Sequence, residues 1–558
     1  MTITSSDVSD ADAPAADGSH DWAPRARFWL DRLLSWPSEG GTAGEQTLAL
    51  KLADELARLP YFTAHPQQLW RQPAWPGGPE NLFALARGQG RQTVVLSGHF
   101  DTVTSHNYGP LAPLANRPEE LRSALLRSLH AAEAPGPSLQ RALHDLEGGE
   151  FLPGRGALDM KSGLAAGLAV LEAWLAQPED ERQGNLLIMF SPDEEDSSRG
   201  ARAARTELLS AAHHWGLDIA AGINLDATSD QGDGSAGRAI YLGTVGKLLP
   251  VVCFVGRDTH AGFPFEGVSA HAMNAELLRR LELNPAHADA AHGEAAPPPV
   301  CLEARDFRAQ YDVTTPQRVW SAYNVLSHAR TPQQVLELML SETQAAMQAV
   351  LERHRAFAAE AGQAFADAQP QVMTLGELRE EVLAAQPQHE RDYTALLSEL
   401  VAETNPLRAS QRVMHWLLDR SERRGPLAVV GFGSLHYPHT HLSRHGAAGE
   451  RLQAAVQAVA AQHSLQMRHY FAGISDMSFI GTPLDPGTLT ELQRQLAAPT
   501  PNFCDDPHTA HLSFPTVNLG PWGRDYHQWL ERVHLPYAVQ GLPAAVWDLT
   551  ARLLKSDA

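Results

Sequence analysis

Short apolar runs that end in polar residues alternate along the chain with longer stretches rich in alanine and leucine. The apolar runs are TVVL (93–96), NLLIMF (185–190), IAAGINL (219–225) and LAVVGF (427–432). Continuous apolar runs of this length are typical of strands that are buried on both faces of an α/β sheet. The stretches between them have the length of helices. The pattern therefore predicts an α/β fold in which these four runs are strands of the main sheet.

Ionisable side chains follow three of these runs. His99 and Asp101 come after the first run, Glu194 and Glu195 after the second, and Asp226 after the third. In open α/β sheets, ligands bind beyond the carboxyl ends of the strands. His99 and Asp101 are two residues apart on an extended chain, so their side chains point the same way and the carboxylate can orient the imidazole. Three such strand ends predict one polar site.

The order of strands and helices changes at about Tyr241. From there the chain has a strand pattern, a helix pattern, a second strand pattern and a long helix pattern, which predicts a small domain inserted into the larger one. The segment from Thr104 to Pro153 has no ligand-like spacing, and we expect a surface insertion there. The expected boundaries are 1–22 for a disordered tail, 23–240 and 377–558 for the two parts of the main, catalytic domain, and 241–376 for the inserted domain.

The composition restricts the class of protein. Hydrophobic residues make up 43% of the 558-residue chain, but no apolar run approaches the ~20 residues of a membrane span. The start of the chain lacks the pattern of a secretory signal and the three cysteines are widely spaced, so we expect a cytoplasmic protein. The formal net charge of -21 opposes binding to phosphate backbones. We expect a small molecule or a peptide as substrate, and neither nucleic acid nor a membrane as partner.

Two further motifs complete a set that can serve two metal ions. Asp159 precedes a small-residue helix in GRGALDMKSG, and Glu194 and Glu195 are adjacent in SPDEED. Taken singly, such an aspartate is usually a helix N-cap and such an acidic run is usually a solvated surface. Together they match a two-metal hydrolase, in which one carboxylate bridges the ions, others are terminal ligands, and a free carboxylate deprotonates a water.

The motifs occur in the order HxD at residue 99, D-x-K-x-G at 159, DEE at 193, an aspartate at 226 and a late histidine at 527. This order resembles the dinuclear zinc exopeptidases and deacylases of peptidase family M20, which include glutamate carboxypeptidase, aminoacylase and succinyl-diaminopimelate desuccinylase. The resemblance covers nearly the whole chain from about Arg25. The long chain, the insertion after HxD and the YPH segment resemble the arginine-utilisation RocB-like branch. The fold implied is α/β, a mixed-sheet zinc-exopeptidase catalytic domain with an inserted ferredoxin-like (α+β) lid and dimerisation domain.

The resemblance also implies an activity and cofactors. The reaction is hydrolysis of an amide bond in a small peptide or an N-acyl amino acid, by an exopeptidase, a dipeptidase or a deacylase with two divalent metal ions. Zinc is the expected metal because imidazole and carboxylate ligands without thiolate suit it, with cobalt and manganese as alternatives. An aminopeptidase that needs a free N-terminus remains an alternative, as does a catalytically silent small-molecule-binding protein of the same fold.

The resemblance assigns roles to individual residues. The metal ligands are His99, Asp159 as the bridging carboxylate, Glu195, Asp226 and His527. The catalytic residues are Glu194 as general base, Asp101 as the group that orients His99, and His260 in the lid, which assists the substrate carbonyl. The substrate-binding residues are Asn324, Gly473 and Asp476.

Two further expectations follow from the resemblance. The peptide bond between Asp159 and Met160 is expected to be cis. His260 is expected to act in the site of a partner chain, within a homodimer that forms through the lid.

Two features depart from the family pattern. Leu326 stands where many relatives carry an arginine for a substrate carboxylate, so Arg330 or Arg318 is expected to replace it, or the carboxylate is not bound in the usual way. The segment HYPHTHLSRH (436–445) is rich in histidine. We expect it to line a pocket or the surface rather than to form a third metal site.

Overall fold

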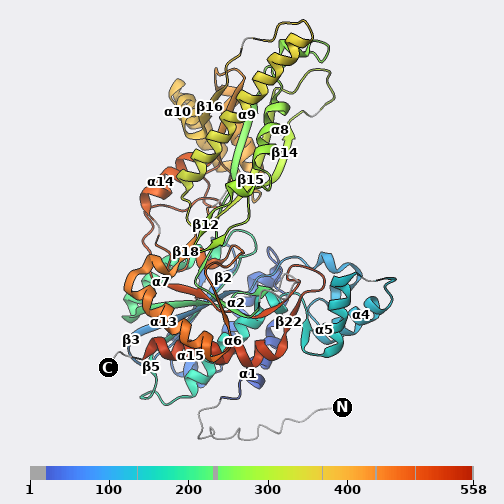
Figure 1. Ribbon diagram of the computed structural model, residues 1–558. Coiled ribbons are helices and arrows are strands. Elements are labelled where there is room, and N and C mark those ends of the chain that lie inside the picture. Colours follow the sequence, from blue (N-terminus) through green and yellow to red (C-terminus); the bar gives the residue numbers. More distant parts are fainter. Residues whose placement is uncertain are drawn as a thin grey trace.

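The computed structural model describes residues 20–134, 136–229, 237–308, 310–366, 368–433, 436–483 and 485–555. These residues form two units, a base below and a lid above (Figure 1). Residues 1–19 of the expected tail lie outside the described residues. The expected end of the tail at residue 22 is too late, because helix α1 (Trp22–Leu34) begins there and Trp22 is buried against Trp547.

The base is built on an eight-stranded mixed sheet. Strand β3 (Gln89–His99) lies at its centre, parallel to both of its neighbours, β5 (Gln183–Ser191) and β6 (Asp218–Asn224). The sheet is completed by β1 (Leu69–Pro73), β2 (Glu80–Ala86), β20 (Thr516–Asn518), β8 (Ala239–Tyr241) and β19 (Gln466–Arg468), in the order β1-β2-β5-β3-β6-β20-β8-β19.

Helices cover both faces of this sheet, which explains the uninterrupted apolar runs. In β3, Val94 and Leu96 pack into one core while Val95 packs into the opposite one, because successive side chains of a strand point to opposite faces. Helix α7 (Arg199–Trp215) covers the second face. The first face is covered by α1, α2 (Ala43–Leu56), α6 (Ser162–Ala176), α13 (Gly446–Gln462) and α15 (Leu542–Leu554).

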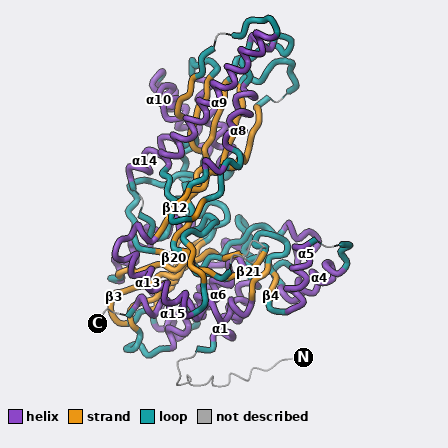
Figure 2. Tube along the Cα trace, viewed as in Figure 1, coloured by secondary structure: helices purple, strands orange, loops and turns teal. Residues whose placement is uncertain are grey.

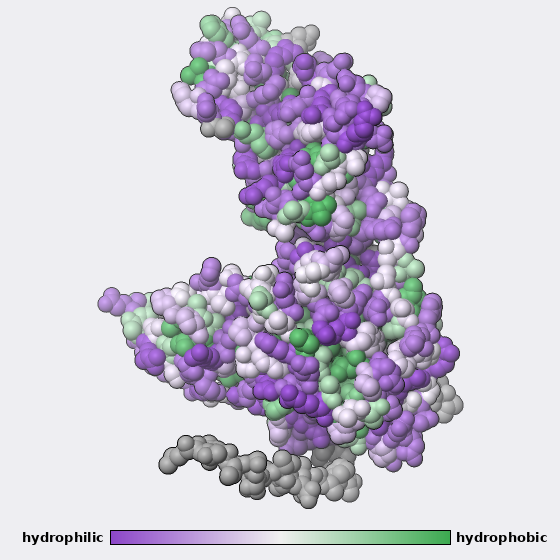
Figure 3. Space-filling model, turned by 180° about the vertical axis from the view of Figure 1, so that it is seen from behind, coloured by the Kyte–Doolittle hydropathy of each residue, from purple (hydrophilic) through white to green (hydrophobic). Residues whose placement is uncertain are grey.

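The insertion after the HxD motif is a helical lobe that packs against the C-terminal part of the base. It contains η2 (His106–Leu114), α4 (Pro118–His130) and α5 (Pro137–Gly148), with a small core of its own that includes Leu530. Asp145 of α5 pairs with Arg524 and Arg532, each at 2.7 Å. These arginines lie in a four-stranded sheet of order β4 (Phe151–Pro153), β22 (Arg532–His534), β21 (Trp522–Arg524) and β7 (Thr228–Ser229). Figure 3 shows a wide notch between this lobe and the lid.

The lid is a second sheet with helices on both of its faces. One face packs on α8 (Ala270–Leu281) and α9 (Pro332–Glu360), and the other on α10 (Leu375–Ala385), α11 (Pro387–Leu400) and α12 (Pro406–Arg420). The strands are β10 (Gly246–Leu248), β15 (Arg318–Ser327), β11 (Pro250–Val255), β17 (Leu427–Phe432) and β16 (Gln371–Thr374), with β14 (Val300–Asp306) paired to β15. The expected α/β fold with an inserted α+β unit is confirmed.

One apolar run lies in a different sheet from the one expected. The run at 427–432 is β17, which pairs antiparallel with β11 of the lid and not with a strand of the base. Its residues alternate between the two lid cores, Val430 in one and Val429 in the other. Because a strand covered on both faces has the same apolar pattern in either sheet, the sequence did not distinguish them. The lid therefore includes residues that the expected boundary at 376 assigned to the base.

Several short elements join the two units. Strand β9 (Gly243–Thr244) pairs with β18 (Thr440–His441), and the hairpin of β12 (Ala290–Ala291) and β13 (Glu294–Ala295) lies at the junction in Figure 2. Helix α14 (Pro486–Gln495) and the residues that follow it as far as Phe503 pack on the lid, although Ile480 before them and Phe514 after them pack on the base. Among the described residues, no helix has both the length and the apolar character that crossing a membrane requires.

Candidate metal centre

Four acidic or imidazole side chains converge beyond the ends of β3, β5 and β6. The Nε2 atom of His99 lies 3.2 Å from Asp159 Oδ1, 3.7 Å from Glu194 Oε2 and 3.7 Å from Asp226 Oδ1. The parallel pairing of the three strands brings their carboxyl ends to the same edge of the sheet, as the sequence predicted.

A second imidazole lies on the other side of Asp159. His527 Nε2 is 3.2 Å from Asp159 Oδ2 and 3.0 Å from Glu195 Oε2. Each oxygen of Asp159 therefore has a different imidazole nitrogen beside it. A carboxylate that bridges two metal ions needs one ligand set on each of its oxygens, and this arrangement provides it.

Several buried atoms of this cluster have no hydrogen-bond partner, although they lie close to one another. They are His99 Nε2, Asp159 Oδ1, Glu195 Oε1 and His527 Nε2. Buried polar atoms are almost always satisfied, and a carboxylate oxygen beside an imidazole lone pair needs a cation between them. The ligand atoms of His99, Asp159 and Glu195 lie within 4.8 Å of one another, so the residues fit divalent metal ions.

Asp101 organises the neighbouring backbone as well as His99. Its two carboxylate oxygens accept hydrogen bonds of 3.1 Å from the backbone N–H groups of Glu194 and Glu195. His99 Nδ1 lies 3.1 Å from the carbonyl oxygen of Asp101 and 3.6 Å from its carboxylate. A proton on Nδ1 can therefore be donated in a hydrogen bond to Asp101. Nε2 then keeps a lone pair that can bind a metal ion.

Glu531 holds the backbone on which Asp159 stands. Its Oε1 accepts from the backbone N–H groups of Leu158 and Asp159, and its Oε2 pairs with Arg155. Burial raises the pKa of Glu531 to about 7, against the opposing charge of Arg155. The bond between Asp159 and Met160 is cis, which confirms that expectation.

The helical lobe positions His527, a contact that the sequence analysis missed. Asn107 Nδ2 donates a 2.6 Å hydrogen bond to the carbonyl oxygen of His527, and Arg155 donates to Asn107 Oδ1 at 2.9 Å. Asn107 and His527 are 420 positions apart in the chain. No motif surrounds Asn107, so no local signal identified it.

The crowding of acidic groups shifts the pKa values of the cluster. Burial raises the pKa of Glu194, and the charges of Asp226 and Glu195 raise it further against the effect of His99. Burial on its own lowers the pKa of His527, but its contacts with Asp159 and Glu195 raise that pKa to about 10. The cluster thus has an excess of negative charge that draws protons or cations.

Three further polar side chains belong to this region. Ser191, the last residue of β5, donates a 2.6 Å hydrogen bond to Asp476, and burial raises the pKa of Asp476 to about 7. Lys247 of lid strand β10 is close enough for the charge of Glu194 to oppose the lowering of its pKa by burial. The sequence analysis named Asp476 but missed Lys247, which stands in an ordinary strand pattern.

Other predicted site residues lie away from the carboxylates. His260 is exposed on a lid loop, where its Nδ1 accepts a 3.0 Å hydrogen bond from Gly262 N and its backbone bridges to Thr314. Asn324 pairs with Val300 within the lid sheet. The carbonyl oxygen of Gly473 accepts from Thr244 Oγ1 at 3.1 Å, at the junction of the two units.

The two arginines expected to replace the family's lid arginine are engaged elsewhere. Arg318 pairs with Asp419 at 2.6 Å, and Arg330 donates to the carbonyl oxygens of His287 and Ala288. All of these partners belong to the lid. The structure therefore gives no support to the expectation that either one reaches the metal centre.

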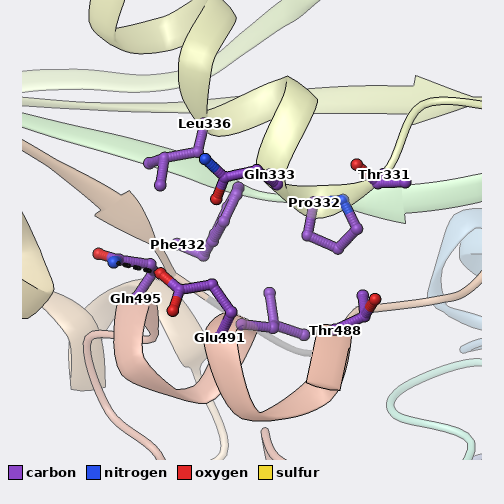
Figure 4. A pocket seen from close by; sticks show the side chains of 9 residues that line it. Thr331, Pro332, Gln333, Leu336, Phe432, Thr488, Glu491 and Gln495 are labelled. Carbon is purple, nitrogen blue, oxygen red and sulfur yellow. Dashed lines mark hydrogen bonds between the residues drawn. The ribbon is translucent and has the colours of Figure 1, made fainter. Parts of the chain in front are cut away.

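A small cavity of about 90 Å³ lies between the start of α9 and α14 (Figure 4). Pro332, Leu336 and Phe432 contribute to its lining, and Gln495 donates a 3.0 Å hydrogen bond to Glu491 at its edge. None of the lining residues belongs to the carboxylate cluster. We interpret it as a packing gap where α14 meets the lid.

The chain is similar to several known proteins. A model of peptidase family M20/M25/M40 matches residues 142–506. The uncharacterized protein YqjN of Bacillus subtilis (strain 168) is 29% identical over 547 residues, which are 95% of this chain and 96% of that protein. Protein RocB of the same organism is 28% identical over 557 residues, 96% of each chain, so the resemblance to a RocB-like branch is confirmed. A tripeptidase from Staphylococcus aureus subsp. aureus Mu50 shares the fold, with a TM-score of 0.53, 16% identity, and coverage of 95% of this chain and 98% of that chain.

Replacing Asn107 tests the support of His527. Asn107→Ala removes the hydrogen bond to the His527 carbonyl, so we expect metal affinity to fall about 10–100-fold, the usual effect of losing a group that orients a ligand. Zinc titration of the metal-stripped protein against a chelator of known affinity measures this. The control is His106→Ala, at the exposed neighbouring residue, which should bind like the unaltered chain. Equal affinity in both variants would show that Asn107 does not position His527.

Proposed function

The chain belongs to peptidase family M20/M25/M40, and from this premise we propose that it hydrolyses an amide bond in a small peptide or an N-acyl amino acid, using two divalent metal ions. Metal-dependent hydrolysis of amide bonds is the activity of the family. The observation that carries the proposal is the position of Asp159 between His99 and His527, with one oxygen toward each imidazole.

The residues divide naturally between two ions. His99, Asp226 and one oxygen of Asp159 would hold the first, while His527, Glu195 and the other oxygen of Asp159 would hold the second. When bound, such a pair supplies Lewis-acid activation of a water and of a substrate carbonyl. The donors are imidazole and carboxylate without thiolate, so we propose zinc, with cobalt or manganese as alternatives.

Glu194 is proposed as the general base. Its carboxylate is buried beside His99, and its backbone N–H donates to Asp101, so the side chain is held at the edge of the cluster. From there it can take the proton of the attacking water and transfer it to the nitrogen of the leaving amine. Asp101 holds both this backbone and the ring of His99, and therefore fixes the base relative to the metal ligands.

Replacing Glu194 tests its role. Glu194→Gln keeps the size of the side chain but removes its basicity, so we expect kcat to fall about 10²–10⁴-fold, the range for a general base. Metal content, measured by mass spectrometry of the elements, should stay unchanged. The matched variant is Glu195→Gln, which should lose metal as well as activity. Loss of metal from Glu194→Gln alone would show that the roles of the two glutamates are exchanged.

A substrate panel tests the activity itself. The panel contains dipeptides, N-acyl amino acids and arginine-derived amides, each assayed with added Zn²⁺, Co²⁺ or Mn²⁺. We expect turnover of at least one class that depends on metal and is lost in Glu194→Gln. Dipeptides with a blocked N-terminus separate a dipeptidase or deacylase from an aminopeptidase, because an aminopeptidase needs the free amine. Metal binding without turnover of any class would favour a silent binding protein.

We further propose that the lid forms a homodimer that brings His260 to the partner's metal centre. His260 is exposed, and its described contacts are with residues of its own lid. Strand β14 is at an edge of the lid sheet, and several large apolar side chains are exposed in this part of the lid. They are Phe263, Leu283, Leu302, Tyr311 and Val313. A second copy of the lid would cover them.

Complementation tests this arrangement. His260→Ala and Glu194→Ala chains should each be nearly inactive alone and regain activity when mixed and allowed to exchange subunits. Random exchange makes half of the dimers mixed, each with one intact composite site, so recovery should approach about a quarter of the unaltered activity. Exchange is verified first with differently tagged chains. Complete exchange without recovery, or a monomer in solution, would refute the proposal.

A further inference from the structure

Three histidines from separate segments meet where the lid joins the base. His292 lies in the turn between β12 and β13, His441 ends β18, and His469 directly follows β19. His441 Nε2 lies 3.2 Å from His469 Nδ1, and His292 stacks on His441 with 4.0 Å between the ring centroids. One ring nitrogen from each of the three lies within 4.8 Å of the others.

We propose that His292, His441 and His469 form a third metal site, which binds one Zn²⁺ ion with a water as fourth ligand. Three imidazoles with an open fourth position are an established zinc donor set. Zn–N bonds of about 2.0–2.1 Å at tetrahedral angles place two nitrogens about 3.4 Å apart, close to the separation between His441 and His469. The site shares no residue with the carboxylate centre, and the inference does not depend on the proposed function.

The hydrogen bonds of His441 allow the ring to carry its proton on Nδ1 when Nε2 binds a metal ion. Nδ1 of His441 accepts from the backbone N–H of Ser443 at 3.2 Å, so the Nε2 proton is the one directed toward His469. Zinc would take the place of that proton. The ring would then carry its proton on Nδ1 and donate it to Ser443 Oγ, which lies 2.8 Å away.

A contact of the hairpin that carries His292 holds it close to the other two histidines. The carboxylate of Glu294 in β13 accepts from the backbone N–H groups of His469 and Tyr470 at 2.9 and 3.0 Å. This contact docks the hairpin against the base and brings His292 to the other two histidines.

The site changes the interpretation of the histidine-rich segment 436–445. Only His441 of this segment belongs to the trio, and its two partners come from positions 292 and 469. A zinc ion there would fasten the lid hairpin to two segments at the base. We therefore assign it a structural role in holding the lid against the base.

A background without the carboxylate centre isolates this site. The full chain carrying His99→Ala and Asp159→Ala lacks a ligand to each proposed catalytic ion, and we expect metal-stripped protein to bind one Zn²⁺ per chain in calorimetric titration. Adding His441→Ala should abolish this binding. Adding His445→Ala, a histidine four positions away that is outside the trio, should leave it unchanged. Adding Ser443→Ala should weaken it about 10–100-fold.

A second measurement applies if the background variant does not fold. In the otherwise unaltered chain, zinc is counted by elemental mass spectrometry after saturation and removal of free metal. His292→Ala, at an exposed turn, should hold one zinc ion fewer per chain than His445→Ala. The proposal is overturned if the folded background binds no zinc, or if His292→Ala and His445→Ala hold equal numbers. Because the catalytic ligands are intact in this arm, loss of the third ion is distinguishable from failure of the carboxylate centre.

Discussion

Electrostatic repulsion among buried carboxylates is the constraint on which the base of this protein depends. Asp101, Asp159, Glu194 and Asp226 are each at most 8% exposed, and they crowd around a single imidazole. Taking such charges out of water is costly unless cations or hydrogen bonds compensate them. The parallel strands bring them together, and the bonds from backbone N–H groups to Asp101 and Glu531 compensate part of the charge. The negative charge that these bonds leave uncompensated favours the binding of divalent cations.

The other imidazole of the cluster, His527, is positioned by elements outside the main sheet. The helical lobe contacts the C-terminal segment that contains His527 in two ways. Asn107 donates a hydrogen bond to the His527 carbonyl oxygen, and Asp145 forms ion pairs with the arginines of β21 and β22. Arg155 connects this lobe to Glu531, and Glu531 to the backbone of Asp159. Asp159 and the imidazole of His527 beside it are thus supported by one connected set of polar contacts. An insertion without motifs of its own thus supports the candidate metal centre.

The sequence predicted the convergence of the strand-end side chains better than it predicted the composition of the lid sheet. The motifs at His99, Glu194 and Asp226 follow buried strands directly, so their positions came from local patterns and a general property of parallel sheets. The contact of Asn107 joins residues far apart in the chain, and the histidine trio joins three segments, so no local pattern contains them. The misassigned strand β17 shows the same limit, because apolar periodicity reports how deeply a strand is buried and not which neighbours it pairs with.

The lid is composed of stretches that are not consecutive, and this affects how it can move. The chain passes between base and lid near Thr244, near Gly433, near Pro483 and near Phe503. A domain attached by two adjacent strands can swing about a single axis through them. Connections spread across the joint resist such rotation, because each lies at a different distance from any one axis. Relative motion of the two units is therefore expected to be a short sliding displacement of packed elements rather than a wide swing, and substrate must enter through an opening whose width changes little.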